Sequence, residues 1–207
     1  MSGGRVVLVR HGQTEWARDG RHTGLTDIPL TELGERQARA AGVLVRELLG
    51  GREPALVLTS PLVRAAHTAE LAGLTAEVEP RLVEWDYGGY EGLTSPQIQQ
   101  LADPGWTVFG DGVIPGPSSP GETLEQVAAR VEAVLERARE ALPHGDVVLV
   151  AHGHSLRVLG ACWLGAGPAL GARLLLDTAG VCVLAHSHDL PGIQHWNLTA
   201  TVAHVEV

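Results

Sequence analysis

Short apolar runs alternate with longer amphipathic stretches along the chain. Three continuous apolar runs, at residues 5–10, 55–59 and 146–151, have the length and the β-branched content of strands that are buried on both faces. Weaker runs predict further strands or extended segments at residues 78–84, 173–176, 181–186 and 194–198.

Apolar residues at helical spacing predict helices between these strands. The first covers residues 31–49, and the next opens at Ser60, whose hydroxyl can cap a helix, with Pro61 in its first turn. Further helices are expected at residues 94–101, 122–142 and 155–164. Residues 104–121 are dense in Pro and Gly and predict a long loop, part of a lid or specificity segment at about residues 85–121.

The order of these elements predicts the fold class. Alternating strands and helices favour an α/β protein in which a mostly parallel sheet lies between two helical layers. The sequence has no repeat or linker, so we expect a single domain over residues 1–207. Ligands of such sheets bind beyond the carboxyl ends of the strands.

Composition narrows the classes of function. A net charge of −9 disfavours a general nucleic-acid surface, and all 15 basic residues are Arg, which leaves an arginine-lined anion pocket open. No run approaches the roughly 20 apolar residues that span a bilayer. The first residues lack a signal-peptide pattern, and Cys162 and Cys182 lie in apolar surroundings. We therefore expect a cytoplasmic protein without a membrane partner.

Four motifs concentrate the candidate chemistry. The first, Arg-His-Gly-Gln-Thr at residues 10–14, directly follows a predicted strand. Gly12 permits a sharp turn, and Arg10 puts a permanent cation beside the imidazole of His11, a nucleophile suited to an anionic substrate. The other motifs follow in order: Ser-Pro-Leu-Val-Arg at 60–64, Glu-Trp-Asp-Tyr-Gly at 84–88 and Ala-His-Gly-His at 151–154.

Together these motifs resemble the histidine phosphatase superfamily, which includes cofactor-dependent phosphoglycerate mutases and many small phosphatases. The resemblance runs from about Arg5 to Val183 and includes Leu-Val-Arg-His-Gly-Gln-Thr-Glu-Trp at 8–16 and Thr-Gly-Leu-Thr-Asp-Ile-Pro-Leu-Thr at 23–31. It implies a phosphoglycerate mutase-like fold. It also implies transfer of a phosphoryl group through phosphohistidine, without a metal or another cofactor.

The resemblance assigns the catalytic roles. His11 corresponds to the nucleophile, and Arg10, Arg64 and His152 correspond to the groups that surround the phosphoryl oxygens. Glu84 matches the acid that protonates the leaving oxygen and then activates water; Asp86 is a competing carboxylate. Such cations and donors are what a transferring phosphoryl group requires.

Substrate contacts are expected from the same motifs and the loop before the first helix: Gln13, Arg21, Thr23, Gly24, Trp85, Tyr87 and His154. Trp85 and Tyr87 are candidate walls of the pocket, and Glu91 is expected to hold the loop. His22 lies near the expected pocket without an assigned role. The His-x-His pairs at 152–154 and 186–188 suggest a metal site, but the first pair fits the phosphatase motif and no carboxylate or cysteine cluster accompanies either.

Departures from the family pattern bear on the substrate. Ala17 stands where mutases and many phosphatases have an asparagine, and Trp85 stands where the mutases carry a substrate-binding arginine. Residues 93–121 contain no Arg or Lys at all. These losses favour net hydrolysis over a mutase. The motifs resemble most a branch that contains acid phosphatases and sugar-bisphosphate phosphatases of the sedoheptulose-bisphosphatase type.

The favoured hypothesis is therefore a metal-independent phosphatase that acts on a small sugar phosphate or a related metabolite. A cofactor-dependent phosphoglycerate mutase is the alternative. A third hypothesis is a catalytically idle protein that binds a phosphate ligand, which Ala17 favours and the intact catalytic set disfavours. Some relatives dimerise, so a homodimer stays open.

Overall fold

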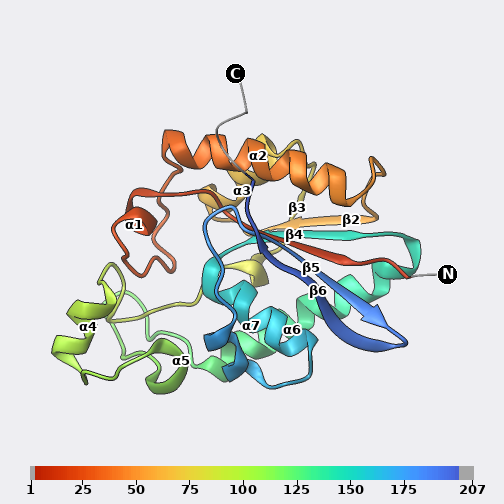
Figure 1. The fold of residues 1–207 in the computed structure, drawn as a ribbon. Coiled ribbons are helices and arrows are strands. Elements are labelled where there is room, and N and C mark those ends of the chain that lie inside the picture. Colours follow the sequence, from red (N-terminus) through yellow and green to blue (C-terminus); the bar gives the residue numbers. More distant parts are fainter. Residues whose placement is uncertain (1–2, 201–207) are drawn as a thin grey trace.

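The computed structural model of the protein describes residues 3–200 (Figure 1). Its centre is a six-stranded mixed sheet in the order β3-β2-β4-β1-β5-β6. The strands are β1 (Val6–Arg10), β2 (Leu56–Thr59), β3 (Glu77–Val78), β4 (Val147–Ala151), β5 (Val181–Ser187) and β6 (Leu190–Leu198). The first four pair in parallel, and β5 and β6 are antiparallel. The predicted α/β class is confirmed, with the antiparallel pair confined to one edge.

Helices cover both faces of the sheet. Figure 1 shows α2 (Glu32–Leu48) and α3 (Val63–Leu71) on one side, and α6 (Leu124–Ala141) and α7 (Gly153–Trp163) on the other. Alternate residues of β1 point into these two layers, because side chains of a strand alternate between faces: Val7 and Val9 join one core cluster, and Leu8 joins the other. The predicted three-layer arrangement is confirmed.

The shorter elements gather where β1 and β4 finish. Figure 1 shows α1 (Glu15–Arg18), α4 (Ser95–Leu101) and α5 (Val108–Asp111) at this end of the sheet. Three 3₁₀ turns, η1 (Pro80–Leu82), η2 (Leu142–His144) and η3 (Pro168–Arg173), complete the set. The segment 104–121 was expected to be a loop throughout, but it contains α5, whose N-cap Thr107 accepts a hydrogen bond from the backbone of Gly110.

Two predicted strands are wrong. In the segment 78–84 the strand ends at Val78, since Pro80 lacks an N–H donor for a ladder and starts η1 instead. In the segment 173–176, Arg173 ends η3 and residues 174–176 follow it without regular structure. There Leu176 is buried and Leu175 is 70% exposed. The apolar run thus serves as one anchor in the core rather than as a strand.

The register of the parallel strands brings the motifs together. Arg10 of β1 lies opposite Ala151 of β4, and the backbone N–H of His11 donates to the carbonyl of Ala151 at 2.9 Å. Ser60, directly after β2, donates its N–H to Val150 at 3.0 Å. Three of the four motifs therefore start at one edge of the sheet. Between residues 3 and 200, no helix has the length and apolar character needed to cross a membrane.

Candidate active site

His11 sits at the end of β1 in a turn that only glycine permits. A Cβ atom on Gly12 would lie 2.2 Å from the carbonyl oxygen of Gly34 in α2. This close approach lets the chain turn under the imidazole of His11. Nδ1 of His11 lies 2.7 Å from the carbonyl oxygen of Gly12. A carbonyl only accepts, so Nδ1 carries the proton and the lone pair of Nε2 is free.

The environment of His11 keeps its imidazole neutral. The side chain is buried. Burial, followed by the guanidinium groups of Arg64 and Arg10, holds the pKa of His11 well below its usual value. A neutral imidazole with a fixed tautomer is the state in which Nε2 can attack phosphorus.

Arg64, in the first turn of α3, is fully buried and its guanidinium group is shared among four acceptors. Nε donates to Nδ1 of His152 at 3.1 Å, and the two Nη atoms donate to the carbonyls of Thr23, Gly24 and Thr26 at 2.8 to 3.1 Å. Arg64 therefore ties the loop 23–26 to the end of β4.

His152 follows β4 and is fully buried. Its Nδ1 accepts from Arg64, so Nε2 carries the proton and donates to Oγ of Ser60 at 2.7 Å. The rings of His152 and His11 lie edge to face with centroids 5.2 Å apart. Burial, and then the charge of Arg64, lowers the pKa of His152 well below its usual value. Both histidines are neutral hydrogen-bonding groups at the sheet edge.

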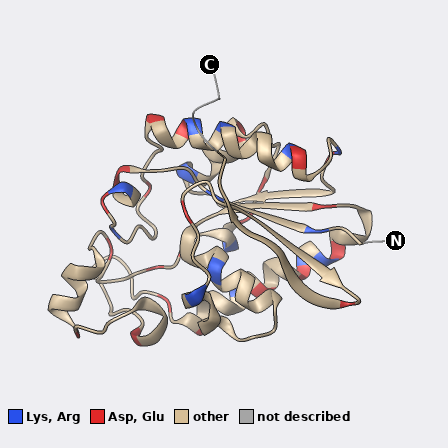
Figure 2. Cartoon of the chain, in the orientation of Figure 1, with Lys and Arg blue, Asp and Glu red and all other residues tan. Residues whose placement is uncertain are grey.

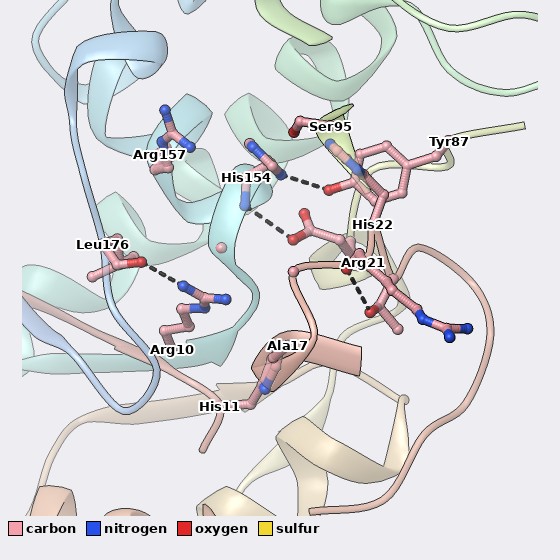
Figure 3. Close-up of a pocket in the computed structure, with 14 residues that line it drawn as sticks. Arg10, His11, Ala17, Arg21, His22, Tyr87, Ser95, His154, Arg157 and Leu176 are labelled. Atoms are coloured by element: carbon pink, nitrogen blue, oxygen red, sulfur yellow. Dashed lines mark hydrogen bonds between the residues drawn. The ribbon is translucent and has the colours of Figure 1, made fainter. Parts of the chain in front are cut away.

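Arg10 supplies charge beside the nucleophile. Its Nη1 donates to the carbonyl of Leu176 at 2.5 Å. Its Nε is buried and has no hydrogen-bond partner among residues 3–200. A buried N–H without an acceptor is costly, and here it belongs to a group that lines a cavity (Figure 3).

Glu84 reaches the same cavity from a different kind of segment. It lies in the coil between η1 and Gly88, and its carboxylate accepts three backbone N–H bonds. Oε1 accepts from Trp85 at 2.9 Å and from Ser155 at 2.8 Å, and Oε2 accepts from His154 at 3.0 Å. The carboxyl group thus lies at the N-terminus of α7, where it accepts from N–H groups that have no partner within the helix.

These residues surround a cavity of about 240 Å³, below the range of about 300–1,000 Å³ for drug-sized ligands. Figure 3 shows the side chains that line it. The lining is Arg10, His11, Ala17, Gly20, Arg21, His22, Thr23, Glu84, Tyr87, Ser95, Gly153, His154, Arg157 and Leu176. Arg64 and His152 lie in the layer behind it.

The remaining predicted contacts divide into two groups. Tyr87 and His154 face the cavity together, with the phenol oxygen of Tyr87 2.6 Å from Nδ1 of His154. Thr23 and Arg21 also line it, although the guanidinium group of Arg21 points away in Figure 3 and lies over the ring of Trp16.

Three predicted substrate contacts do not line this cavity. Trp85 is fully buried, with its indole N–H donating to the carbonyl of Glu122. Gly24 donates its N–H to Glu91. Gln13 accepts from the hydroxyl of Thr31 on the other side of the loop.

Sequence reasoning missed several lining residues. His22 had no role, yet its buried ring stacks parallel to that of His154 at 6.0 Å. Arg157 was not singled out, although it lies one helical turn after His154 and so on the same face of α7. That spacing was the available signal. Ser95, at the start of α4, was visible only once the chain was folded.

Glu91 holds the loop beside Arg64. Its carboxylate accepts from the N–H groups of Gly24 and Thr26 at 2.9 to 3.1 Å.

Between residues 3 and 200, no three His, Cys, Asp or Glu side chains gather as in a metal site. His186 and His188 lie exposed at the β5–β6 turn.

Comparison with known proteins gives this geometry its context. The chain is 39% identical to an acid phosphatase of Mycobacterium tuberculosis over 94% of this chain and 93% of the relative. It is 34% identical to sedoheptulose 1,7-bisphosphatase of Saccharomyces cerevisiae, over 79% of this chain and 68% of that one. A relative named probable phosphoglycerate mutase, from Photorhabdus laumondii, is 33% identical over 89% of this chain and 86% of its own.

A solved structure agrees with the fold. A mycobacterial glucosyl-3-phosphoglycerate phosphatase in complex with VO3 superimposes with a TM-score of 0.78 and 32% identity, covering 95% of this chain and all of that one. The family model that matches residues 6–199 is that of the histidine phosphatase superfamily, branch 1. The residues that gather at the sheet edge therefore lie in a fold that is also seen in solved structures. The chain belongs to the histidine phosphatase superfamily.

Proposed function

We propose that the protein is a metal-independent phosphomonoester hydrolase that works through a phosphohistidine at His11. The observation that carries this proposal is the fixed tautomer of His11, which leaves the lone pair of Nε2 free on a residue that lines a cavity together with Arg10 and Glu84. Two of the relatives reported above carry the names of phosphatases, which supports the same reaction class.

In the first step, Nε2 of His11 attacks the phosphorus atom of the ester and the bond to the alcohol oxygen breaks. Arg10 compensates charge on the non-bridging oxygens. The N–H of Gly153, at the start of α7, is a further donor on the lining. Glu84 gives its proton to the departing oxygen, and Oε2 is the oxygen that has capacity for it, because it accepts one backbone bond where Oε1 accepts two.

In the second step, water replaces the histidine. Glu84, now ionised, takes a proton from the water as its oxygen attacks phosphorus, and the bond to Nε2 breaks. Inorganic phosphate leaves, and His11 returns to its neutral state. The low pKa of His11, which burial and two arginines cause, favours this return.

Hydrolysis is favoured over a mutase reaction by the walls of the cavity. Trp85, in the position of the mutase arginine, is buried and does not line the cavity. Figure 2 shows α4 and α5 without any blue residue, since residues 93–121 contain no Arg or Lys. A carboxylate of phosphoglycerate would therefore find no cation from α4 or α5 themselves, and the arginines of the cavity lining are Arg10, Arg21 and Arg157.

We propose a small sugar phosphate or a related metabolite as the substrate class. The size of the cavity and its polar lining, with Thr23, Ser95, His22 and His154, support a compact polar ligand. A cytoplasmic location fits the two free thiols. The homodimer and the lid function of residues 85–121 stay predictions.

The test is a hydrolysis screen on chelator-treated protein with sugar phosphates, phosphoglycerates and 4-nitrophenyl phosphate. His11→Ala is expected to lower kcat by at least about 10⁴-fold with every ester, as the loss of a covalent nucleophile does. Acid-labile labelling of His11 during turnover would identify the intermediate. Residual activity near wild type in His11→Ala would contradict the nucleophile.

Three outcomes would each favour a different alternative. Primer-dependent isomerisation of 3-phosphoglycerate that outpaces hydrolysis would establish the mutase reaction instead. Tight binding of phosphate without turnover of any ester would establish a binding protein. Activity lost to the chelator and restored by a divalent metal would overturn the metal-independent mechanism.

A further inference from the structure

Glu84 is held in place by neither a helix nor a strand. Residues 83–87 are coil, whereas His11 and His152 directly follow strands. The three N–H bonds to the carboxylate fix its oxygens, but the backbone that carries the side chain needs its own support. Proton transfer tolerates little displacement, since an error of about 1 Å costs about 10²-fold in rate. The inference below rests on the acid role proposed for Glu84.

Arg130, in the second turn of α6, binds the backbone on the N-terminal side of this segment. Its Nη1 donates to the carbonyls of Arg81 at 2.9 Å and Val83 at 2.8 Å. Its Nη2 donates to the carbonyl of Glu84 itself at 3.1 Å. A planar guanidinium group can make several such bonds in one fixed geometry, which an ammonium group cannot.

Glu122 binds the C-terminal side. Its carboxylate pairs with Nε and Nη2 of Arg130 at 2.8 and 3.0 Å. Oε2 also accepts from the backbone N–H of Asp86 at 3.0 Å, and the carbonyl of Glu122 accepts from the indole of Trp85 at 2.8 Å. The ion pair therefore forms hydrogen bonds with the chain on both sides of Glu84.

We propose that the Arg130–Glu122 pair is a positioning element for the acid, which sets the backbone of Glu84 so that its carboxyl meets the leaving oxygen. Neither residue lines the cavity, so both act through Glu84. Arg130 and Glu122 are 13% and 21% exposed, and the pair is thus shielded from the solvent that weakens surface ion pairs.

The helix α6 provides a matched control. Arg137 lies seven residues after Arg130, on the same face of the helix. It also links α6 to the chain before Glu84, through Glu77 and through Glu79 at 3.2 Å, but it is 35% exposed, and within residues 3–200 its side chain makes no hydrogen bond to the segment 81–86. Loss of Arg137 removes a comparable tie between the same elements without reaching the acid.

The experiment compares an ester with a poor leaving group, glycerol phosphate, with one that has a good leaving group, 4-nitrophenyl phosphate. Arg130→Gln and Glu122→Gln are expected to lower kcat by about tenfold or more on glycerol phosphate and by less than about threefold on 4-nitrophenyl phosphate, because only the former needs the proton. The loss of kcat on glycerol phosphate in Arg130→Lys should lie between those of wild type and Arg130→Gln. Arg137→Gln should keep the wild-type ratio of kcat values on the two esters.

Each outcome bears on a separate claim. Equal losses on both esters in folded Arg130→Gln and Glu122→Gln would overturn the positioning role, and so would the same ratio change in Arg137→Gln. If Arg130→Gln does not fold, the nearly isosteric Glu122→Gln decides. Glu84→Gln is the reference: if it shifts the ratio of kcat values and the Arg130 and Glu122 variants do not, only this inference fails. If Glu84→Gln leaves the ratio unchanged, the acid role fails first and takes the inference with it.

Discussion

Two regions build this site by different physical means. At the sheet edge, His11 and His152 come directly after β1 and β4, and the backbone ladder of the strands sets their positions. The segment 83–87 carries Glu84 with no such ladder, and side chains from α6 and backbone groups from α7 hold it instead. The nucleophile is therefore fixed by secondary structure and the acid by tertiary contacts.

This difference indicates which part of the site tolerates substitutions better. A strand buried on both faces resists local change, because each residue shares its hydrogen bonds and packing with two neighbouring strands. A coil segment depends on a few polar contacts, and losing one partner leaves another unsatisfied. Substitutions far from the substrate should thus impair proton transfer more readily than nucleophilic attack.

Among the substitutions that compare these two regions, Glu84→Gln is expected to have the largest effect. Glu84→Gln keeps the size of the side chain but removes the proton, and kcat on glycerol phosphate is expected to fall by about 10²- to 10⁴-fold. On 4-nitrophenyl phosphate the loss should be at least tenfold smaller, which steady-state kinetics on both esters will measure.

Asp86→Asn is the matched control for Glu84→Gln. Asp86 accepts from the backbone of Gly88 and from the hydroxyl of Ser119, and it does not line the cavity. For Asp86→Asn, the ratio of kcat on glycerol phosphate to kcat on 4-nitrophenyl phosphate should stay at the wild-type value. A larger ratio change in Asp86→Asn than in Glu84→Gln would transfer the acid role to Asp86.

The same division explains what the sequence could predict. The apolar runs identify β1, β2 and β4, and with them the shared location of His11, Ser60 and His152, since parallel strands end at one edge. The family and the phosphatase class followed from the motifs and are confirmed. The catalytic roles stay predictions, although the chain folds their residues together.

Other features depend on contacts that no local pattern contains. The leucine run at 173–176 reads as a strand because a short apolar run has no distinctive period. Trp85 was expected to form a pocket wall, but an aromatic residue beside a site serves equally well as core, and this one is buried. Arg130 belongs to the helix predicted at residues 122–142, and no local pattern in the sequence places it against residues 81–84, where the fold puts it.

The second prediction tests the sheet-edge region through its stability. His11 and His152 have pKa values lowered by burial and by Arg64, so the unfolded chain binds more protons than the folded one once the pH falls below about 6.5. Stability then rises with pH. Each histidine is expected to remove up to about 1.4 kcal/mol of unfolding free energy per pH unit as the pH falls below that value.

Urea unfolding at pH 7.5, 6.5 and 5.5 measures this slope. His152→Asn should lower the slope of unfolding free energy against pH by the contribution of one proton, up to about 1.4 kcal/mol per pH unit. This expectation does not depend on how the substitution changes stability at pH 7.5. His188→Gln, at the exposed β5–β6 turn, is the control and should keep the wild-type slope. An unchanged slope in His152→Asn would mean that this buried histidine is already charged in the folded protein.

The third prediction concerns the loop that Arg64 supports. Glu91 accepts from Gly24 and Thr26, whose carbonyls accept from Arg64. Glu91→Ala leaves these N–H groups without their acceptor, and we expect the KM for phosphate esters to rise by about tenfold, equivalent to about 1.4 kcal/mol, with a smaller fall in kcat. Glu91→Gln, which keeps one acceptor oxygen, should lie between. A change in kcat alone would contradict a role in substrate binding.

The smallest effect is expected at Gln13, where the motif and the geometry disagree. Gln13 belongs to the same string as His11, yet its side chain turns toward α2 and accepts from the hydroxyl of Thr31 at 3.1 Å. Gln13→Ala should cost about 1 kcal/mol of stability for the lost hydrogen bond. It should change kcat and KM by less than about threefold, because no bond to substrate disappears with it. A tenfold rise in KM, with the melting temperature preserved, would show that Gln13 turns into the cavity when substrate binds. The motif would then be the better guide to the role of Gln13 than the position of its side chain in the free protein. One side chain at the otherwise rigid sheet edge would change its position when substrate binds.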